Sequence, residues 1–369
     1  MTATATKRQA GRGTRWSVGE LLSLLKRFDK VVQKRPLRPI LASVLFRDGR
    51  IIASSGTVQV DYPLAGEATM LLPYLRLKAI LDSCPREAEV RFTAGKASCR
   101  VECEKASWAL PTESADEFPI LSCGDAAPFF RVPADQFRRM TAAVTHAVDT
   151  SRAEATVLRS VCFDVLNGEV TLAATDGRAL ATAEAGIDQS VDNKVRLVPV
   201  EAVEAMRTFA DGEGAVQLEA STTAVVCTIQ DGAVVTASLV SGAYPRWRDI
   251  VPDADRGEQS VVEKQVLINA LKSARVCSDE ASRGVTLTFS EKGLRLHSKS
   301  ATAGEASVTC DLTEFGQAAT VKLDPAYVLA WLDHLPADGD PMICIDAASP
   351  EDRVVFRSDD FLAVIAPLA

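Results

Sequence analysis

Three segments of the chain read LLPYLRLKAILD (residues 71–82), LVPVEAVEAMRTF (residues 197–209) and LDPAYVLAWLDHL (residues 323–335). Each places a proline shortly after a leucine and continues with the apolar spacing of an amphipathic helix. Proline is well tolerated in the first turn of a helix, where its missing N–H has no intrahelical acceptor. Consecutive prolines of the three segments are 126 residues apart. This equal spacing indicates three copies of one structural unit.

A second amphipathic helix is expected upstream of each proline segment. Residues 21–32 and 137–148 carry apolar or small side chains at helical spacing, and residues 267–274 keep most of that pattern. Alternating strands and glycine turns lie between the two helices, so each unit should run helix, strands, helix, strands. The predicted class is α+β, with helices laid on sheets. We expect a flexible basic tail followed by three domains, at residues 1–15, 16–126, 127–255 and 256–369.

Composition and motifs favour a binding protein over an enzyme. The chain of 369 residues is 47% hydrophobic and 24% charged, and its nine cysteines include no paired C-x-x-C spacing. It contains no phosphate-binding G-x-x-x-x-G-K-[ST] loop and no nucleophile elbow. Asp176, followed by Gly177, is more typical of a turn than of a catalytic carboxylate. We therefore expect no catalytic residue, no metal site and no cofactor.

Neither a secretion signal nor a membrane span is expected. The first residues, MTATATKRQAGRGTR, have no apolar stretch behind their basic side chains. No segment approaches the roughly 18 apolar residues that a transmembrane helix needs. These features favour a cytoplasmic location.

The charge is unevenly distributed along the chain. The net charge is −8, yet residues 15–35 alone carry six basic and two acidic side chains. The remaining predicted helices are close to neutral, so the strands and loops are strongly acidic. Weak phosphate contacts along basic helices suit a protein that binds DNA loosely and depends on salt. Ordinary solvated helix faces are the alternative interpretation.

Four segments carry a resemblance to a known family. They are RPLRPIL (35–41), LPTESADEFPIL (110–121), ATDGRALA (174–181) and VSGAYPRWRDIVP (240–252). Together they resemble the bacterial DNA sliding clamp, the beta subunit family of DNA polymerase III, over residues from about 16 to 369. The last two segments are specific in combination, because the third alone is merely a turn.

The resemblance implies a non-catalytic processivity factor. Three tandem clamp domains would form a head-to-tail homodimer, whose six similar domains close a ring around double-stranded DNA without reading its sequence. Closure of the ring would also remove exposed sheet edges. The implied partners are DNA polymerase and clamp loader subunits. The alternative is a clamp-like adaptor, or a specialised additional clamp, that binds protein partners without the standard replicative function.

The charge pattern and the resemblance together predict two sets of contacts outside the partner groove. The DNA-contacting side chains are expected to be Lys26, Arg27, Lys30, Arg35, Arg76 and Arg152. At the dimer interface, Trp108 and Leu110 would meet Val276 and Cys277 of the other copy. Tryptophan in an apolar pocket is a typical interface anchor.

The resemblance also implies a hydrophobic groove that takes short peptide motifs from partners. Carried over by position, its residues are Leu158, Thr175, Gly177, Arg178, Leu180, Pro245, Ile250, Tyr327, Ala348 and Ile365. Arg178 and Ala179 replace the usual His-Arg pair, and Asp249 stands where the family is usually basic. The sequence therefore predicts weaker binding of acidic partner motifs, because a rim that loses positive charge repels carboxylates.

Overall fold

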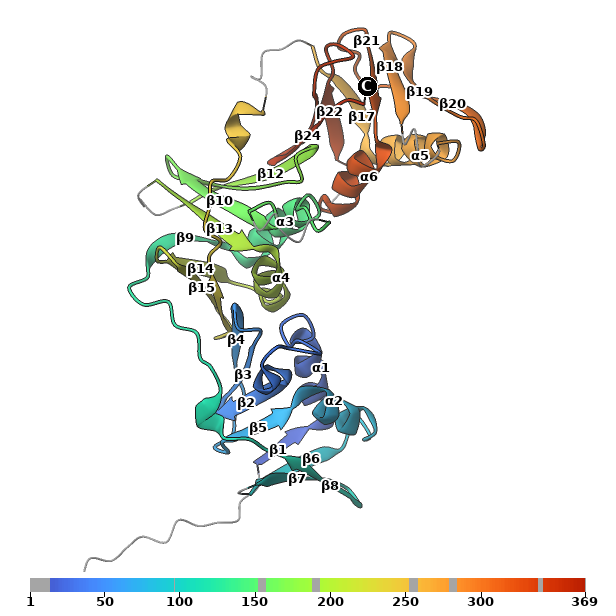
Figure 1. Ribbon diagram of the computed structural model, residues 1–369. Helices are drawn as coiled ribbons and strands as arrows, with labels where there is room; N and C mark the ends of the chain where they lie inside the picture. Colours follow the sequence, from blue (N-terminus) through green and yellow to red (C-terminus); the bar gives the residue numbers. More distant parts are fainter. Residues whose placement is uncertain are drawn as a thin grey trace, which may run out of the picture. The chain divides into compact units, whose positions relative to one another are not determined.

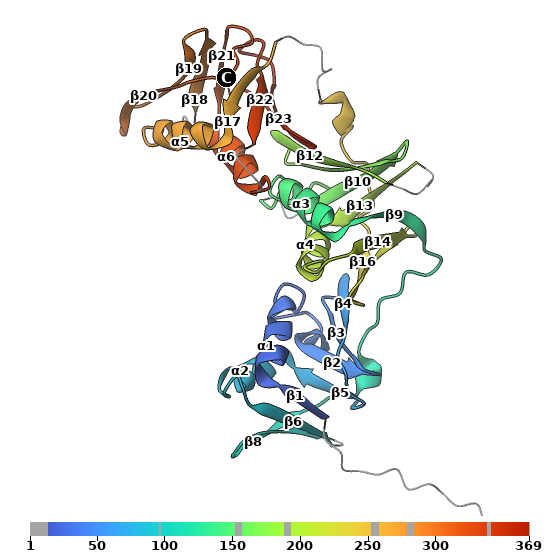
Figure 2. The same ribbon diagram turned by 180° about the vertical axis from the view of Figure 1, so that it is seen from behind.

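The computed structural model describes residues 14–95, 97–151, 157–187, 193–251, 258–278, 284–337 and 341–368. The chain forms two compact units (Figures 1 and 2). Unit 1 contains residues 1–128 and 204–238, and unit 2 contains residues 129–203 and 239–369.

Within the described residues, one order of elements occurs three times: strand, helix, four strands, helix, three strands. The first copy contains β1 (Thr14–Ser17), α1 (Val18–Arg27), β2 (Ser43–Arg47), β3 (Arg50–Ser54), β4 (Val58–Pro63), β5 (Met70–Pro73), α2 (Tyr74–Asp82), β6 (Glu89–Ala94), β7 (Ser98–Cys103) and β8 (Ala106–Pro111). The second contains β9 (Ala127–Pro133), α3 (Ala134–Thr145), β10 (Ser160–Leu166), β11 (Glu169–Thr175), β12 (Ala179–Gly186), β13 (Lys194–Pro199), α4 (Val200–Phe209), β14 (Ala215–Ala220), β15 (Ala224–Ile229) and β16 (Val234–Ser238). The third contains β17 (Ser260–Glu263), α5 (Lys264–Arg275), β18 (Val285–Ser290), β19 (Gly293–Ser300), β20 (Gly304–Cys310), β21 (Ala319–Leu323), α6 (Pro325–His334), β22 (Met342–Asp346), β23 (Val354–Ser358) and β24 (Phe361–Ile365). The predicted threefold α+β repeat is confirmed, and the strand that precedes the first helix of each copy is an addition to it.

Strand pairing joins successive copies. One eight-stranded sheet has the order β5-β2-β3-β4-β16-β15-β14-β9, and the other has the order β13-β10-β11-β12-β24-β23-β22-β17. In both sheets, the third of the four strands between the two helices of one copy pairs with the last strand of the next copy. These pairs are β4 with β16 and β12 with β24. The two four-stranded sheets, β1-β6-β7-β8 and β20-β19-β18-β21, hold the equivalent strands β8 and β20 at their edges.

The repeated proline marks the passage from strand to helix. Pro73 and Pro199 are the last residues of β5 and β13, and α2 and α4 begin at the next residue. Only Pro325 is itself the first residue of its helix, where Asp324 accepts a hydrogen bond from the backbone N–H of Ala326 at 2.9 Å. Pro73 and Pro199 end their strands, and at all three positions the fixed φ of proline suits the passage into the helix, which is why the same residue recurs.

The first helix is shorter than its apolar pattern. Helix α1 ends at Arg27, and Phe28 caps it, yet Phe28 and Val32 are buried in the turn that follows. Leu21 and Leu25 are also buried, so the apolar face continues beyond the helix and closes over the sheet. Helix α1 lies next to α2 in unit 1, and α5 lies next to α6 in unit 2 (Figures 1 and 2).

Two hairpin turns use left-handed backbone conformations. Asp48-Gly49 joins β2 to β3 with φ angles of 52° and 73°, and Asn167-Gly168 joins β10 to β11 with φ angles of 54° and 83°. Positive φ at both central residues is what a tight hairpin requires, and Asn, Asp and Gly adopt it with least strain.

Candidate functional sites

An apolar cavity of about 100 Å³ opens beside the eight-stranded sheet of unit 2, which contains β12 and β24. Its floor comes from two paired strands, with Leu180 on β12 directly opposite Val364 on β24. Pro245 and Ile250, from the segment that follows residue 239, supply another wall. Leu180 and Val364 belong to a larger apolar cluster, against which Ile250 packs.

Six of the ten predicted groove residues line this cavity: Thr175, Gly177, Arg178, Leu180, Pro245 and Ile250. The structure adds three residues that the sequence did not place in the groove, Arg353, Val364 and Ala366, and the lining also contains Ala179 from the predicted rim. Val364 and Ile365 are neighbours on one strand, so their side chains point to opposite faces of the sheet. Strand alternation could have identified Val364, but only with the pairing of β24 and β12 in hand.

The other four predicted groove residues lie outside the lining of the cavity. Ile365 is buried, with 1% of its surface exposed, and Ala348 is exposed after β22. Leu158 is half-buried, and its carbonyl accepts the backbone N–H of Asp149 at 3.0 Å. Tyr327 is half-buried on α6.

Asp176 organises the turn beside the cavity. Its Oδ1 accepts the backbone N–H groups of Arg178 and Ala179 at 2.8 and 2.9 Å, and its Oδ2 accepts the hydroxyl of Tyr327 at 2.8 Å. Burial and this hydrogen bond raise the pKa of Tyr327 to about 12, so its hydroxyl stays a donor. Gly177, in the same turn, has a φ of 90°, a conformation that favours glycine. Asp176 therefore has the structural role that its Asp-Gly context predicts.

The rim of the cavity carries more positive charge than the sequence predicts. Asp249, the carboxylate expected to repel acidic motifs, forms an ion pair with Arg246 at 3.2 Å. Arg353 stands at the rim, and its Nη1 donates to the carbonyl of Ile250 at 3.5 Å. Ala179 is only 8% exposed and lines the cavity, so a larger side chain there would fill the space that a ligand needs.

A second cavity, which is polar and measures about 350 Å³, is lined in part by Trp247 and Arg248. These two residues belong to the same segment as Ile250. The guanidinium of Arg248 lies 4.3 Å from the centre of the Trp247 ring and pairs with Asp164 at 3.0 Å. Burial and the nearby Glu169 raise the pKa of Glu184 in its wall. Arginines and carboxylates are mixed here, so this cavity shows no preference for one sign of ligand charge.

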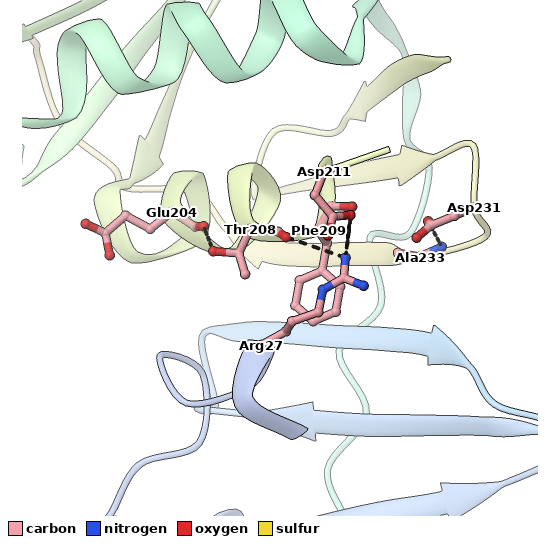
Figure 3. A network of polar contacts seen from close by, with 7 residues as sticks. All are labelled: Arg27, Glu204, Thr208, Phe209, Asp211, Asp231 and Ala233. Atoms are coloured by element: carbon pink, nitrogen blue, oxygen red, sulfur yellow. Dashed lines mark hydrogen bonds and ion pairs between the residues drawn. The ribbon is translucent and has the colours of Figure 1, made fainter. Parts of the chain in front are cut away.

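Arg27, a predicted DNA contact, is held inside unit 1 (Figure 3). One of its terminal nitrogens donates to the carbonyl of Phe209 at 3.2 Å and pairs with Asp211 at 3.0 Å. Its guanidinium also lies 4.4 Å from the ring centre of Phe209 and 5.0 Å from that of Tyr62. These contacts give Arg27 a structural role that the sequence did not reveal, because its hydrogen-bond partners are more than 180 residues away along the chain.

The other predicted DNA contacts differ in how free they are. Lys30 forms an ion pair with Glu204 at 2.9 Å. Within the described part of the chain, the exposed side chains of Lys26, Arg35 and Arg76 have no hydrogen-bond or ion-pair partner. Arg152 lies outside the described residues.

The predicted interface residues lie near the two free strand edges. Trp108 is half-buried on the edge strand β8, whereas Leu110 on the same strand is only 4% exposed. Val276, the residue after α5, is 74% exposed, and Cys277 is half-buried. Trp108 and Val276 thus keep apolar surface that a single chain leaves open to water.

No other chemistry gathers in the described residues. Among them, no group of three or more His, Cys, Asp or Glu side chains is placed to hold a metal ion. All nine cysteines are free thiols, and burial raises the pKa of Cys162 to about 12. No helix in the described ranges is long and apolar enough to cross a membrane.

Comparison with known proteins matches most of the chain to one family. Residues 131–246 match the central domain of the DNA polymerase III beta subunit, and residues 248–368 match its C-terminal domain. The beta sliding clamp of Haemophilus influenzae is 24% identical over 341 residues, which are 89% of this chain and 92% of that protein. The beta sliding clamp of Escherichia coli K12 is 24% identical over 364 residues, or 94% and 97% of the two chains.

Solved structures show the same fold. The DNA polymerase III beta subunit of Pseudomonas aeruginosa superposes with a TM-score of 0.86 at 19% identity, covering 97% of this chain and 100% of that one. The beta subunit of Thermotoga maritima gives a TM-score of 0.85 at 19% identity, covering 97% and 99%. Both matches span all three copies of the repeated unit.

Proposed function

The chain belongs to the DNA polymerase III beta subunit family of sliding clamps, and we propose from this that it is a non-catalytic ring that encircles duplex DNA. In the cytoplasm it tethers DNA polymerases and other DNA-processing proteins through the apolar groove of unit 2, and a separate clamp loader places it on DNA. The observation that supports this role is the apolar cavity lined by Leu180 and Ile250, two of the residues that the resemblance assigns to a partner groove. An apolar pocket with a few polar groups suits peptide recognition.

The three domains of the ring are proposed at residues 16–126, 127–255 and 256–369. Each of these ranges holds one copy of the repeated order of two helices and eight strands, apart from the first two residues of β1. The proposed boundaries fall between β8 and β9 and between β16 and β17.

Closure by a second copy follows from the strand order. Two joints within the chain pair equivalent strands, β4 with β16 and β12 with β24. Strand β20 is the equivalent of β4 and β12, and β8 is the equivalent of β16 and β24, yet both are sheet edges. Pairing β20 of one copy with β8 of the next repeats the same joint and covers two exposed edges. Two copies joined head to tail in this way form a closed dimer of six domains.

Helix ends support the same joint. In two cases, the residue that follows the first helix of one copy contacts the end of the second helix of the next copy. The ring centres of Phe28 and Phe209 are 5.1 Å apart, and those of His146 and His334 are 5.0 Å apart. Val276 is the third residue of this kind, and it is 74% exposed. Its partner in the proposed dimer is the end of α2 of the other copy, and Trp108 is the apolar anchor expected on the strand β8 of that copy.

Retention on circular DNA tests the proposed function. Loaded protein should stay on a nicked circular plasmid during gel filtration and should leave once the plasmid is cut to a linear form, because a ring slides off a free end. Equal retention on circular and linear DNA indicates ordinary surface binding. No retention on either, with a loader present, favours the clamp-like adaptor.

A further inference from the structure

Two arginines flank the apolar cavity, and no carboxylate of the described residues pairs with either. Arg178 stands on the turn between β11 and β12, and Arg353 stands just before β23; both are exposed and line the cavity. The single hydrogen bond from Arg353 to the carbonyl of Ile250 uses one of the five N–H donors of its guanidinium. The remaining donors are free for a ligand at the rim.

The carboxylates around the cavity are already engaged. Asp176 accepts two backbone N–H groups and a tyrosine hydroxyl, and Asp249 pairs with Arg246. Asp352 accepts a serine hydroxyl at 2.8 Å, and the exposed Glu351 is not part of the cavity lining. A ligand at the rim therefore meets two free guanidinium groups and carboxylates that are mostly compensated.

The size of the cavity limits what enters it. Pockets that take whole small molecules measure roughly 300–1,000 Å³, whereas this one measures about 100 Å³. Its apolar floor of Leu180 and Val364 and its small volume suit one aliphatic side chain. The rest of such a ligand stays at the rim, within reach of Arg178 and Arg353.

We infer that Arg353, together with Arg178, makes the groove selective for an acidic peptide segment that anchors one leucine-sized side chain between two or more carboxylates. The inference rests on the proposed function of the groove and names the class of partner. It reverses the expectation from sequence, which counted Asp249 and Ala179 as losses of positive charge. Arg353 lies more than 100 residues from that linker along the chain but next to it in space, because it contacts Ile250.

Matched peptides test the inference on the full-length protein. The probes are two fluorescein-labelled nine-residue peptides with the same central pair of leucines, flanked by four glutamates in one and by four glutamines in the other. Anisotropy titration at 50 mM salt should show the glutamate peptide binding about tenfold tighter, because charge-assisted hydrogen bonds contribute more than neutral ones. The ratio should fall toward about twofold at 500 mM salt, where exposed charges are screened.

Variants assign the effect to the rim. Arg353→Gln should remove most of the tenfold preference, and Arg353→Lys should retain part of it, since a lysine keeps the charge without the planar fork. Arg295→Gln, at an exposed arginine on β19, is the matched control and should leave the preference unchanged. An unchanged ratio in Arg353→Gln, or equal binding of both peptides by the native protein, overturns the inference.

Two further results separate this inference from the proposed function. If replacing the leucine pair by serine abolishes binding while the charge preference is absent, the groove still anchors peptides and only the acidic selectivity is wrong. If neither leucine peptide binds up to 1 mM, the acidic-partner inference fails. Retention on circular DNA then decides independently whether the ring function stands.

Discussion

Two joints lie within the chain, where β4 pairs with β16 and where β12 pairs with β24, and different side chains pack beside each of them. The first joint is built on an aromatic pair and a cation: Phe28 meets the edge of Phe209, and Arg27 covers the same ring. The second is built on two histidines that stack at 5.0 Å with an angle of 15° between their rings. His146 is half-buried there, and its Nδ1 is shielded from water.

The histidine joint should make the protein sensitive to acid. Burial, followed by the nearby His334, lowers the pKa of His146 to about 4 from its usual 6.5. Between these values the unfolded chain binds a proton that the folded chain excludes, so stability falls as the pH drops from 6.5 towards 4. The maximum slope is about 1.4 kcal/mol per pH unit. Urea unfolding from pH 7 to 4 measures it: His146→Phe should flatten the profile, and an unchanged profile contradicts the assignment.

Arg27 should contribute to folding more than to DNA binding. Arg27→Ala removes its hydrogen bonds to Thr208 and Phe209, its ion pair and its ring contacts, so we expect a loss of about 2 kcal/mol. Arg27→Lys should recover little, because stacking against the rings of Phe209 and Tyr62 needs the planar guanidinium. Lys26→Ala, on the exposed side of the same helix, should change stability by less than about 0.5 kcal/mol. Denaturant unfolding of the three variants tests this assignment; equal stability of Arg27→Ala and the native protein contradicts it.

At the scale of elements, two free strand edges matter most. Strands β8 and β20 end the four-stranded sheets, whereas their equivalents are paired inside eight-stranded sheets. A single copy leaves the backbone groups of these edges unpaired and apolar side chains such as Val276 exposed, and both features promote aggregation. A specific partner for these edges removes that tendency.

Removing the apolar anchors should therefore give folded monomers. Trp108→Ala and Val276→Asp each delete apolar surface at the proposed joint between copies, and sedimentation at low micromolar concentration should show the mass of one chain. Ile120→Asp, at another exposed apolar side chain (51% exposed), is the control and should stay dimeric. A Trp108→Ala variant that remains dimeric, or that loses its circular dichroism spectrum, contradicts the interface.

At the scale of the whole molecule, the proposed binding of DNA has to overcome a net negative charge. The net charge of −8 repels phosphates on average, so binding depends on where the free cations lie. Lys26, Arg35 and Arg76 are exposed and without an ion-pair partner in the described ranges, whereas Arg27 and Lys30 are paired. We expect the three free cations to carry more of the DNA contact than the two paired ones.

Salt dependence measures how many phosphates these cations meet. Each contact contributes about −0.9 to the slope of log K against log salt. Reversing Lys26, Arg35 and Arg76 to glutamate should weaken DNA association and flatten the slope by about 2 to 3. Reversal of Arg295, Lys292 and Lys299 on and beside β19 provides a control with the same change in net charge. Equal slopes for both triple variants indicate that net charge alone governs binding.

The sequence by itself determined the threefold repeat and the order of its helices and strands, apart from the strand that opens each copy. These features rest on local rules: a proline that ends a strand and starts a helix, apolar spacing along a helix, and Asp-Gly or Asn-Gly at tight turns. The turn from Thr175 to Leu180 and the Pro245–Ile250 segment were assigned to the groove by the resemblance to the family, and both are short, continuous stretches of sequence.

Only the tertiary structure decided which charges are free. Arg27 pairs with Asp211, which is 184 residues away along the chain, and Arg353 donates to the carbonyl of Ile250, which is 103 residues away. No local sequence pattern predicts such pairs. The choice of Val364 over Ile365 for the cavity depends on how β24 pairs with β12, because a shift of one residue turns every side chain to the other face. Burial, pairing and charge neutralisation are properties of neighbours in space, and the fold alone brings those neighbours together.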